Sequence, residues 1–435
     1  RDWPGYAITE LVSYKPIRVG NRHSVRSNGI PYVIACTLYT LRMYMVKTGG
    51  EWERLDQSNE PPVYFNLNDF ESVDYDCRLS SDGSVVHVAF RTTKNGAGGD
   101  WTNTTYYVTF NLSTRTWGTP EAILGFDDGI YNQRWGGIFN GSAYTNAVSL
   151  SLDSNDKVFV AYCKRVEVVG EDPRNYIYCI NNASGSWSSP EVVFDYQWTD
   201  QVAITYQVPT LIHDSDDNLH FGAHTLFAGS IMAGWWGYCW RKRSPAGVYN
   251  TYEHAIVART QTSPPSAGRP FPTTNIHSPR ITVDQGGQPH FAVMAHETLL
   301  PTPPPQPYPL VHIWRTDAGW WGNYEVITEP AGTSGTVMLE SDPMTIIGDN
   351  AYVLYFPAIA GHMSNTDYTK MMRKTKLSGG SWGSEILFKQ FTLGQSASGG
   401  MSISNDDPSY VDVMWSDPVG SSSQYNIFWY FHETE

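Results

Sequence analysis

The chain repeats one strand, turn and strand pattern along its whole length, and this repeat limits the folds that are open to it. In the clearest copy, residues 277–299, an alternating apolar segment precedes the turn Asp284-Gln-Gly-Gly287, and His290–Met294 follows it. Alternation of this kind predicts strands, while Asp, Asn and Gly favour the tight reversals between them. Residues 148–163 and 208–224 are close copies.

Seven such turns occur at intervals of roughly 55 to 70 residues, as expected for four short strands plus their connections. They lie at Arg26–Gly29, Ser81–Ser84, Asp153–Asp156, Asp214–Asp217, Asp284–Gly287, Gly348–Asn350 and Ser404–Pro408. A third strand follows each turn and second strand. A fourth strand usually opens at a tryptophan, at Trp52, Trp117, Trp187, Trp321 and Trp382.

The two ends of the chain complement each other. The last repeat stops after its third strand, and the alternating segment 6–14 precedes the first repeat without a role in it. We therefore predict an all-β fold, a seven-bladed β-propeller with four-stranded antiparallel blades, in which 6–14 completes the last blade and closes the ring. We expect a single domain over 1–435, with blades at approximately 16–60, 70–125, 145–196, 207–259, 277–330, 340–392 and 399–435.

Charge and hydropathy exclude some partners. The net charge of −14 comes without a basic stripe, which argues against nucleic acid. No apolar run approaches the roughly 18 residues of a membrane span. The chain begins at Arg1 with neither a methionine nor an apolar leader, so we expect either that a signal was removed or that this is a processed or excised piece. We expect an extracellular or surface-exposed protein.

Five cysteines without CxxC spacing predict buried free thiols. Cys163 and Cys179 flank one hairpin, but the loop between them places the two out of direct register. No metal-binding motif is present, so we predict no cofactor. The Asp-rich turns, such as 153–156, could offer oxygens to calcium, but they lack the distal Glu of a calcium loop, and turn formation explains them better.

The connections between strands fall into two sets, which a propeller places on opposite faces. One set consists of tight turns. The other set is long and chemically mixed, and long loops on a rigid scaffold are where binding usually resides. We expect the functional surface on that face, formed by loops at 91–104, 164–174, 225–237, 297–310 and 357–368.

The candidate catalytic residues lie where strands meet that face: Arg91, His224, His296 and Tyr206. His224 and His296 close the second strands of adjacent repeats, and His277 enters a first strand from the same face. Imidazoles near one point could move a proton or bind a metal, or each could simply cap a strand.

The candidate ligand-binding residues are cations, aromatic side chains and one histidine in or beside the long connections. Aromatic rings stack on sugar rings, and Arg or Lys pairs with sugar carboxylates. The set comprises Arg134, Trp135, Lys164, Arg165, Trp235, Trp236, His277 and Tyr355. Tryptophans at the fourth strands, in contrast, are expected to fill the space between blades.

Two sets of motifs resemble known families. The phrase Ser186-Trp-Ser-Ser-Pro-Glu191, with the strand and turn pattern, resembles the BNR or sialidase-like propeller superfamily. The segments Val86–Arg91, followed by Asn95–Gly98, and Leu219–His224 resemble propellers of the ulvan-lyase type. That resemblance implies β-elimination with Arg91 on the uronate and His224, or a tyrosine, as base.

Two functional hypotheses stay open. The first, slightly favoured because the Asp boxes and arginine triad of sialidases are not recognisable, is a non-catalytic glycan-binding or structural surface protein, such as an adhesin or a component of a virion or extracellular assembly. The second is a carbohydrate-active enzyme, either a polysaccharide lyase on an acidic, uronate-containing glycan or a sialidase-like hydrolase. Both predict an acidic polysaccharide as partner.

Overall fold

The computed structural model describes twenty segments of the chain, and all regular structure in them is β-strand. The described residues are 6–13, 22–37, 40–47, 51–56, 70–95, 100–123, 128–132, 148–166, 174–195, 197–199, 202–229, 235–255, 280–294, 310–320, 323–328, 344–355, 370–390, 401–404, 409–418 and 424–433. Within these segments, no helix is long and apolar enough to cross a membrane.

The chain forms two compact units. One contains Arg1–Phe194, Gln207–Leu211 and Ala397–Glu435, and the other contains Asp195–Tyr206 and Ile212–Ser396. Nothing in the structure tests the expectation of a single domain, which stays a prediction.

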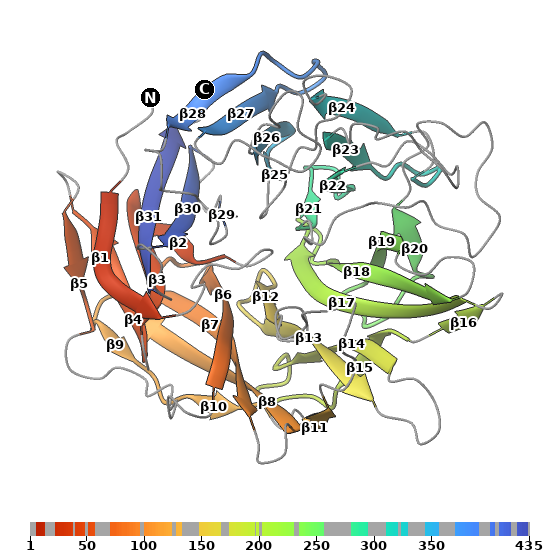
Figure 1. Ribbon diagram of the computed structural model, residues 1–435, viewed down its shortest axis with the longest axis horizontal. Coiled ribbons are helices and arrows are strands. Elements are labelled where there is room, and N and C mark those ends of the chain that lie inside the picture. Colours follow the sequence, from red (N-terminus) through yellow and green to blue (C-terminus); the bar gives the residue numbers. More distant parts are fainter. Residues whose placement is uncertain are drawn as a thin grey trace. The chain divides into compact units, whose positions relative to one another are not determined.

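Four sheets belong to the first unit, and in three of them the strands follow one another in sequence order (Figure 1). The first is β2 (Ser24–Ser27), β3 (Ile30–Thr37), β4 (Thr40–Val46) and β5 (Trp52–Arg54). The second is β6 (Phe70–Leu79), β7 (Val85–Asn95), β8 (Asp100–Asn111) and β10 (Glu121–Ala122), with β9 (Thr116–Trp117) and β11 (Asp128–Asn132) also on β8. The third is β12 (Val148–Leu152), β13 (Val158–Val166), β14 (Arg174–Asn181) and β15 (Glu191–Phe194).

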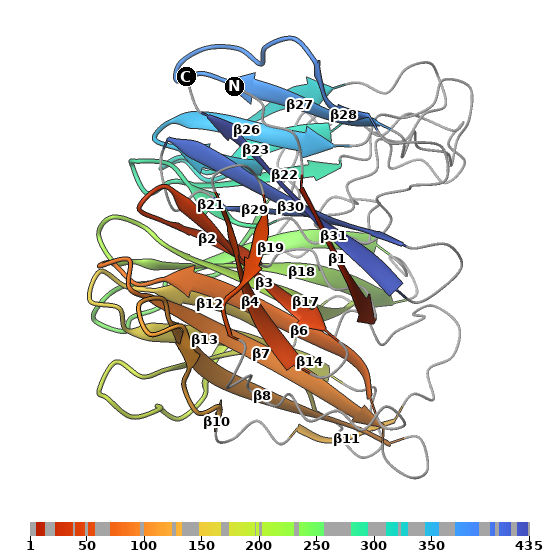
Figure 2. The same ribbon diagram turned by 90° about the vertical axis from the view of Figure 1, so that its left-hand side faces the viewer.

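The fourth sheet joins the two ends of the chain. Its order is β1 (Tyr6–Ser13), β31 (Gln424–Glu433), β30 (Tyr410–Pro418) and β29 (Met401–Ser404). Strand β1 runs antiparallel beside β31, with Tyr6 opposite Trp429 (Figure 2). The N-terminal strand therefore supplies the fourth strand that the last repeat lacks.

Three further sheets follow the same plan. One is β16 (Gln197–Thr199), β17 (Val202–His213), β18 (Leu219–Gly229), β19 (Trp235–Arg243) and β20 (Glu253–Ala255). The next is β21 (Thr282–Val283), β22 (Pro289–Met294), β23 (Leu310–Trp314) and β24 (Tyr324–Thr328). The last is β25 (Met344–Ile347), β26 (Asn350–Tyr355), β27 (Lys370–Lys376) and β28 (Ile386–Gln390). The described strands thus form seven sheets with mainly four antiparallel strands.

The predicted turns form for the expected reason. Asn28, Asp156 and Asp217 have positive φ angles near 55°, as do several glycines at larger values, and Asn, Asp and Gly are the residues that tolerate this region best. Neighbouring turns also touch. A Cβ on Gly287 would lie 2.9 Å from Asp214 Oδ2 of the preceding turn, so a glycine is required there.

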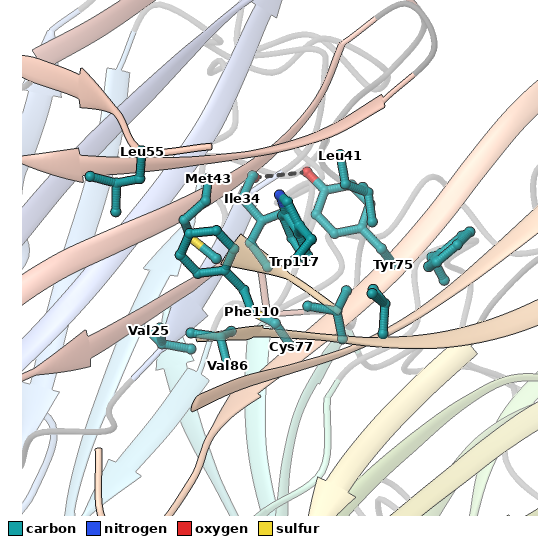
Figure 3. Packing of buried hydrophobic residues seen from close by; sticks show 13 residues of the cluster. Val25, Ile34, Leu41, Met43, Leu55, Tyr75, Cys77, Val86, Phe110 and Trp117 are labelled. Atoms are coloured by element: carbon teal, nitrogen blue, oxygen red, sulfur yellow. Dashed lines mark hydrogen bonds between the residues drawn. The ribbon is translucent and has the colours of Figure 1, made fainter. Parts of the chain in front are cut away.

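Apolar side chains fill the space between consecutive sheets. Between the first two sheets, Ile34 and Met43 lie against Phe110 and Trp117, and the Tyr75 hydroxyl donates to the Ile34 carbonyl over 3.1 Å (Figure 3). The prediction that the fourth-strand tryptophans fill the space between sheets is correct for Trp117. Its Nε1 donates to Asp56 of the preceding sheet over 2.7 Å.

The same device recurs in later repeats. Trp187 packs edge-on against Tyr107 with ring centroids 5.4 Å apart, and Trp382 packs edge-on against His312 at 5.7 Å. In the fifth repeat the packed residue is Trp320, which contacts Trp240 at 6.2 Å. The predicted residue, Trp321, lies outside the described residues. Trp187, Trp320 and Trp382 therefore each pack on the third strand of the preceding repeat, and Trp117 bonds to Asp56, just after the fourth.

Buried thiols are confirmed where the structure describes them. Cys77, Cys163, Cys179 and Cys239 are buried and form no disulfide in the part of the chain that the structure describes. In the hairpin of β13 and β14, Cys163 lies opposite Ile177 and Cys179 opposite Ala161, so the two thiols are out of register as expected.

A buried carboxylate connects three sheets of the first unit. Asp76 on β6 is 0% exposed and accepts hydrogen bonds from the Arg22 amide at 2.7 Å, the Leu150 amide at 2.7 Å, the Ser149 hydroxyl at 3.1 Å and Arg78 at 2.6 Å. A buried charge with this many donors is stable only while all of them stay in place.

We predict that Asp76→Ala lowers the free energy of unfolding by about 3–5 kcal/mol, because it leaves the buried Arg78 guanidinium and the Arg22 and Leu150 amides without their carboxylate acceptor. Asp76→Asn should lose less, since its amide oxygen still accepts. Asp216 is an exposed turn residue and Asp216→Ala is the control, with a change within about 0.5 kcal/mol. Urea denaturation measures all three, and equal stability of Asp76→Ala and the parent would contradict the account.

Candidate functional site

Two hairpins are longer than the sequence predicts. Residues 91–104 and 225–237 were expected to be loops, but β7 continues to Asn95, β8 starts at Asp100, β18 continues to Gly229 and β19 starts at Trp235. These loop predictions are wrong. Thr, Trp and Tyr dominate the segment 101–107, and their β-branched or aromatic side chains favour continued pairing over a loop.

Arg91 and His224 therefore lie inside strands and not at their ends. Each is the fourth residue after a histidine that begins the second strand, His87 or His220. Arg91 pairs with Thr105 and His224 pairs with Tyr238. In both sheets the fourth strand ends near this position: β10 ends opposite Tyr106, and β20 ends opposite Tyr238. The hairpin formed by the second and third strands continues beyond that point.

The equivalence of the two positions rests on a repeated contact. His87 Nδ1 lies 2.6 Å from the Tyr107 hydroxyl, and Trp240 Nε1 donates to His220 Nδ1 over 3.2 Å. In each sheet the partner stands two residues before the one directly opposite the histidine. A third sheet repeats this diagonal with His290 and His312. In this register Met294 is the residue of β22 equivalent to His224.

Arg91 joins two sheets of the first unit. Its side chain is 1% exposed, and its Nη1 donates to the Cys163 carbonyl of β13 over 2.6 Å. Its guanidinium carbon lies 5.7 Å from the centre of the Tyr162 ring. A buried cation held by a carbonyl and an aromatic face is a strong local source of positive potential.

Tyrosine rings lead away from Arg91 along one face of the neighbouring sheet. Tyr162 stacks on Tyr178 at 5.6 Å, and Tyr178 contacts Tyr176 at 6.1 Å. Lys164 lies directly opposite Tyr176 and two residues beyond Tyr162, so its side chain is on the same face. We call Arg91, Tyr162, Lys164, Tyr176 and Tyr178 the Arg91 cluster.

The Arg91 cluster combines a buried cation, a partly exposed one and an aromatic column. Tyr176 and Lys164 are both partly exposed, whereas Arg91 and Tyr162 are buried. Such a surface can hold an anionic sugar, because the ring stacks on the sugar and the ammonium group pairs with its carboxylate. The sequence analysis missed the three tyrosines, although their period-2 spacing with Lys164 was visible.

Tyr355 occupies a different environment. It is 1% exposed, in the core between β21–β24 and β25–β28, and its hydroxyl donates to the Glu385 carboxylate. Burial, and then the Glu385 carboxylate, raise the pKa of this phenol well above its usual range. Tyr355 therefore holds its proton firmly.

The other candidates are only partly described. His224, Tyr206, Arg165, Trp235 and Trp236 lie in β18, β17, β13 and β19, but their side chains are outside the described part of the structure. Both tryptophans begin a strand and do not lie in a loop as predicted. The remaining candidates lie outside the described residues, namely His296, His277, Arg134 and Trp135. Among the described residues, no group of three His, Cys, Asp or Glu side chains could hold a metal ion.

Comparisons with known proteins identify the fold. No family model and no curated protein matches the chain. Among solved structures it is similar to an ulvan lyase described as a new family of polysaccharide lyase, with 12% identity, a TM-score of 0.55 and coverage of 98% of this chain and 95% of that one. It is also similar to the polysaccharide lyase Uly1, with 8% identity, a TM-score of 0.53 and full coverage of both chains.

A Trypanosoma rangeli sialidase bound to sialic acid is a more remote match, with 9% identity, a TM-score of 0.45 and coverage of 98% of this chain and 59% of that chain. Likeness at these identities concerns the fold alone. The chain is an all-β propeller with four-stranded antiparallel blades, as the sequence predicts.

We predict that Arg91→Met lowers the free energy of unfolding by about 1–3 kcal/mol, because the Cys163 carbonyl loses its buried donor. Lys164→Met, at a partly exposed position of the same cluster, should cost less than about 0.5 kcal/mol. Chemical denaturation of both variants measures the difference. Equal effects would contradict the role of Arg91 as a link between sheets.

Proposed function

We propose that this chain is a polysaccharide lyase that cleaves an acidic, uronate-containing glycan by β-elimination. The observation that carries the proposal is the Arg91 cluster, which offers two cations and an aromatic column on one sheet face. The fold likeness to two polysaccharide lyases over nearly the whole chain supports an enzyme more than the non-catalytic surface protein that the sequence slightly favours.

β-Elimination needs a positive charge near the sugar carboxylate. A base removes the proton on the carbon beside the carboxylate, the electron pair forms a C=C bond, and the glycosidic C–O bond breaks as its oxygen takes a proton. Cationic groups stabilise the carbanion-like charge that develops on the carboxylate. Lys164 is exposed enough to contact the carboxylate, and Arg91 adds positive potential from its buried position.

The proposed base is His224, which occupies in its own sheet the position that Arg91 occupies in another. A neutral imidazole is suited to proton transfer near neutral pH. We propose Tyr206 as the group that returns a proton to the leaving oxygen, and His296 as a further catalytic candidate. The further candidates for the glycan contacts are His277, Arg134, Trp135, Arg165, Trp235 and Trp236. Tyr355 would act only by supporting its strand, because its hydroxyl is engaged with Glu385.

The number of blades and the closure of the ring are also part of the proposal. We propose that the seven sheets are the blades of one closed ring, because β1 pairs with β31 in the manner that ring closure requires. An extracellular location is proposed because a polymeric substrate is met outside the cell.

We expect the protein to release unsaturated uronate products, seen as ultraviolet absorbance, from at least one member of a panel of uronate-rich and sulfated polysaccharides. His224→Ala should lower kcat by about 10²–10⁴-fold because it removes the base. Lys164→Ala should mainly raise KM, since it removes a carboxylate contact.

The matched control is Lys157→Ala, at the tight turn between β12 and β13, and should keep both constants. New reducing ends without absorbance would identify a hydrolase instead, and binding without turnover would restore the adhesin hypothesis. Full activity of His224→Ala would remove the proposed base.

A further inference from the structure

Three sheets contain the same buried diagonal contact, and one of them differs in chemistry. The second-strand histidine meets Tyr107 in the sheet of β6–β10 and Trp240 in the sheet of β16–β20. In the sheet of β21–β24 its partner is another histidine, His312, at 2.8 Å from His290 Nδ1. The equivalent position therefore carries a basic side chain in this sheet, unlike the tyrosine and tryptophan of the others.

The hydrogen positions of this pair follow from its surroundings. His290 Nε2 lies 3.3 Å from Asp284 Oδ2, a charge contact without hydrogen-bond geometry, and a carboxylate favours a proton on the nitrogen that faces it. His290 Nδ1 then accepts the Nε2–H of His312. The Nδ1 atom of His312 is left as a lone pair, and it has no hydrogen-bond partner among the described residues.

His312 is also the contact point with the next sheet. It is 3% exposed, and Trp382, which precedes β28, packs on it edge-on at 5.7 Å. Lys376 of β27 lies 5.3 Å from the ring of Trp314 and pairs with Glu325 of β24, which stands opposite His312 in register. The charged or titratable groups around His312 are thus Asp284, His290, Glu325 and Lys376.

We propose that the chain Asp284, His290 and His312 makes the joint between β21–β24 and β25–β28 acid-sensitive, so that mild acid loosens it before the equivalent joint between β16–β20 and β21–β24. A second proton on His312 can only go to the lone-pair Nδ1. The resulting cation would be buried against Trp382 and close to Lys376, while Asp284 is already engaged by His290 and Glu325 by Lys376.

The direction of the pH effect follows from the same surroundings. Burial first, and then the neighbouring His290 and Lys376, hold the pKa of His312 well below its usual range. An unfolded or opened chain therefore binds a proton that the closed joint excludes. The stability of the joint is complete above about pH 6.5, the usual pKa of an exposed histidine, and is lost progressively as the pH falls below that value.

Other groups in the chain respond in the same direction, so the test must be local. Burial also lowers the pKa values of His87 and His220. Hydrogen–deuterium exchange of peptides from β23 and β27 separates the proposed joint from the rest. Peptides from β19 report the equivalent joint, in which Trp320 packs on Trp240.

The decisive variant is His312→Trp, which installs the residue found at the equivalent position 240. An indole Nε1–H can still donate to His290 Nδ1, as Trp240 does to His220, but it accepts no proton. From pH 7.5 to 5.5, we expect exchange in β23 and β27 of the parent to rise several-fold more than in β19. In His312→Trp this excess should disappear.

The reciprocal variant is Trp240→His, which should create an acid-dependent rise in β19 that the parent lacks. If His312→Trp does not fold at pH 7.5, His312→Tyr replaces it, since Tyr107 fills this position in another sheet. An equal acid-induced rise in the parent and in the Trp or Tyr variant would overturn the proposal, as would a parent rise of the same size in β19.

Discussion

The carboxylate of Asp76 sets the relation between three sheets of the first unit. It is removed from solvent, and its hydrogen bonds reach back to the segment before β2 and forward to β12. Because an uncompensated buried charge costs several kcal/mol, the first strands must approach each other closely enough to supply all donors. The Ser149 hydroxyl extends the network, because it accepts a hydrogen bond from the Leu211 amide over 3.1 Å. Each sheet is thus positioned by polar contacts as well as by apolar packing.

The third and fourth strands are connected by weaker but regular contacts. A cation from one repeat pairs with a glutamate on the fourth strand of the preceding sheet: Arg115 with Glu53, Arg315 with Glu253, and Lys376 with Glu325. These pairs are partly or largely exposed and contribute little net stability. Their regular recurrence, together with the inserted tryptophans, fixes how adjacent sheets align. Contacts at the first strands and at the fourth strands thus hold adjacent sheets together. The residue type at positions between these contacts can differ from sheet to sheet.

Function and regulation are both proposed at those variable positions. At one of these equivalent positions, one sheet has Arg91 and another has His224. There the second and third strands extend beyond the end of the fourth strand. Another position holds Tyr107, Trp240 or His312. A rigid repeat tolerates such exchanges because the polar links at the strand ends persist. The same scaffold can therefore present a cationic, aromatic surface at one position and a proton-sensitive contact at another.

The sequence by itself determined the repeat, the turns and the strand order, because these depend on local alternation and on residues that tolerate positive φ angles. It also predicted that Trp117, Trp187 and Trp382 pack between sheets and that the cysteines are buried thiols. Tertiary structure alone decided that Arg91 is buried against Cys163 and Tyr162, that Trp320 contacts the preceding sheet, and that His290 meets His312. These contacts join residues far apart in sequence or diagonal across strands, and no local pattern encodes which side chains meet when sheets pack.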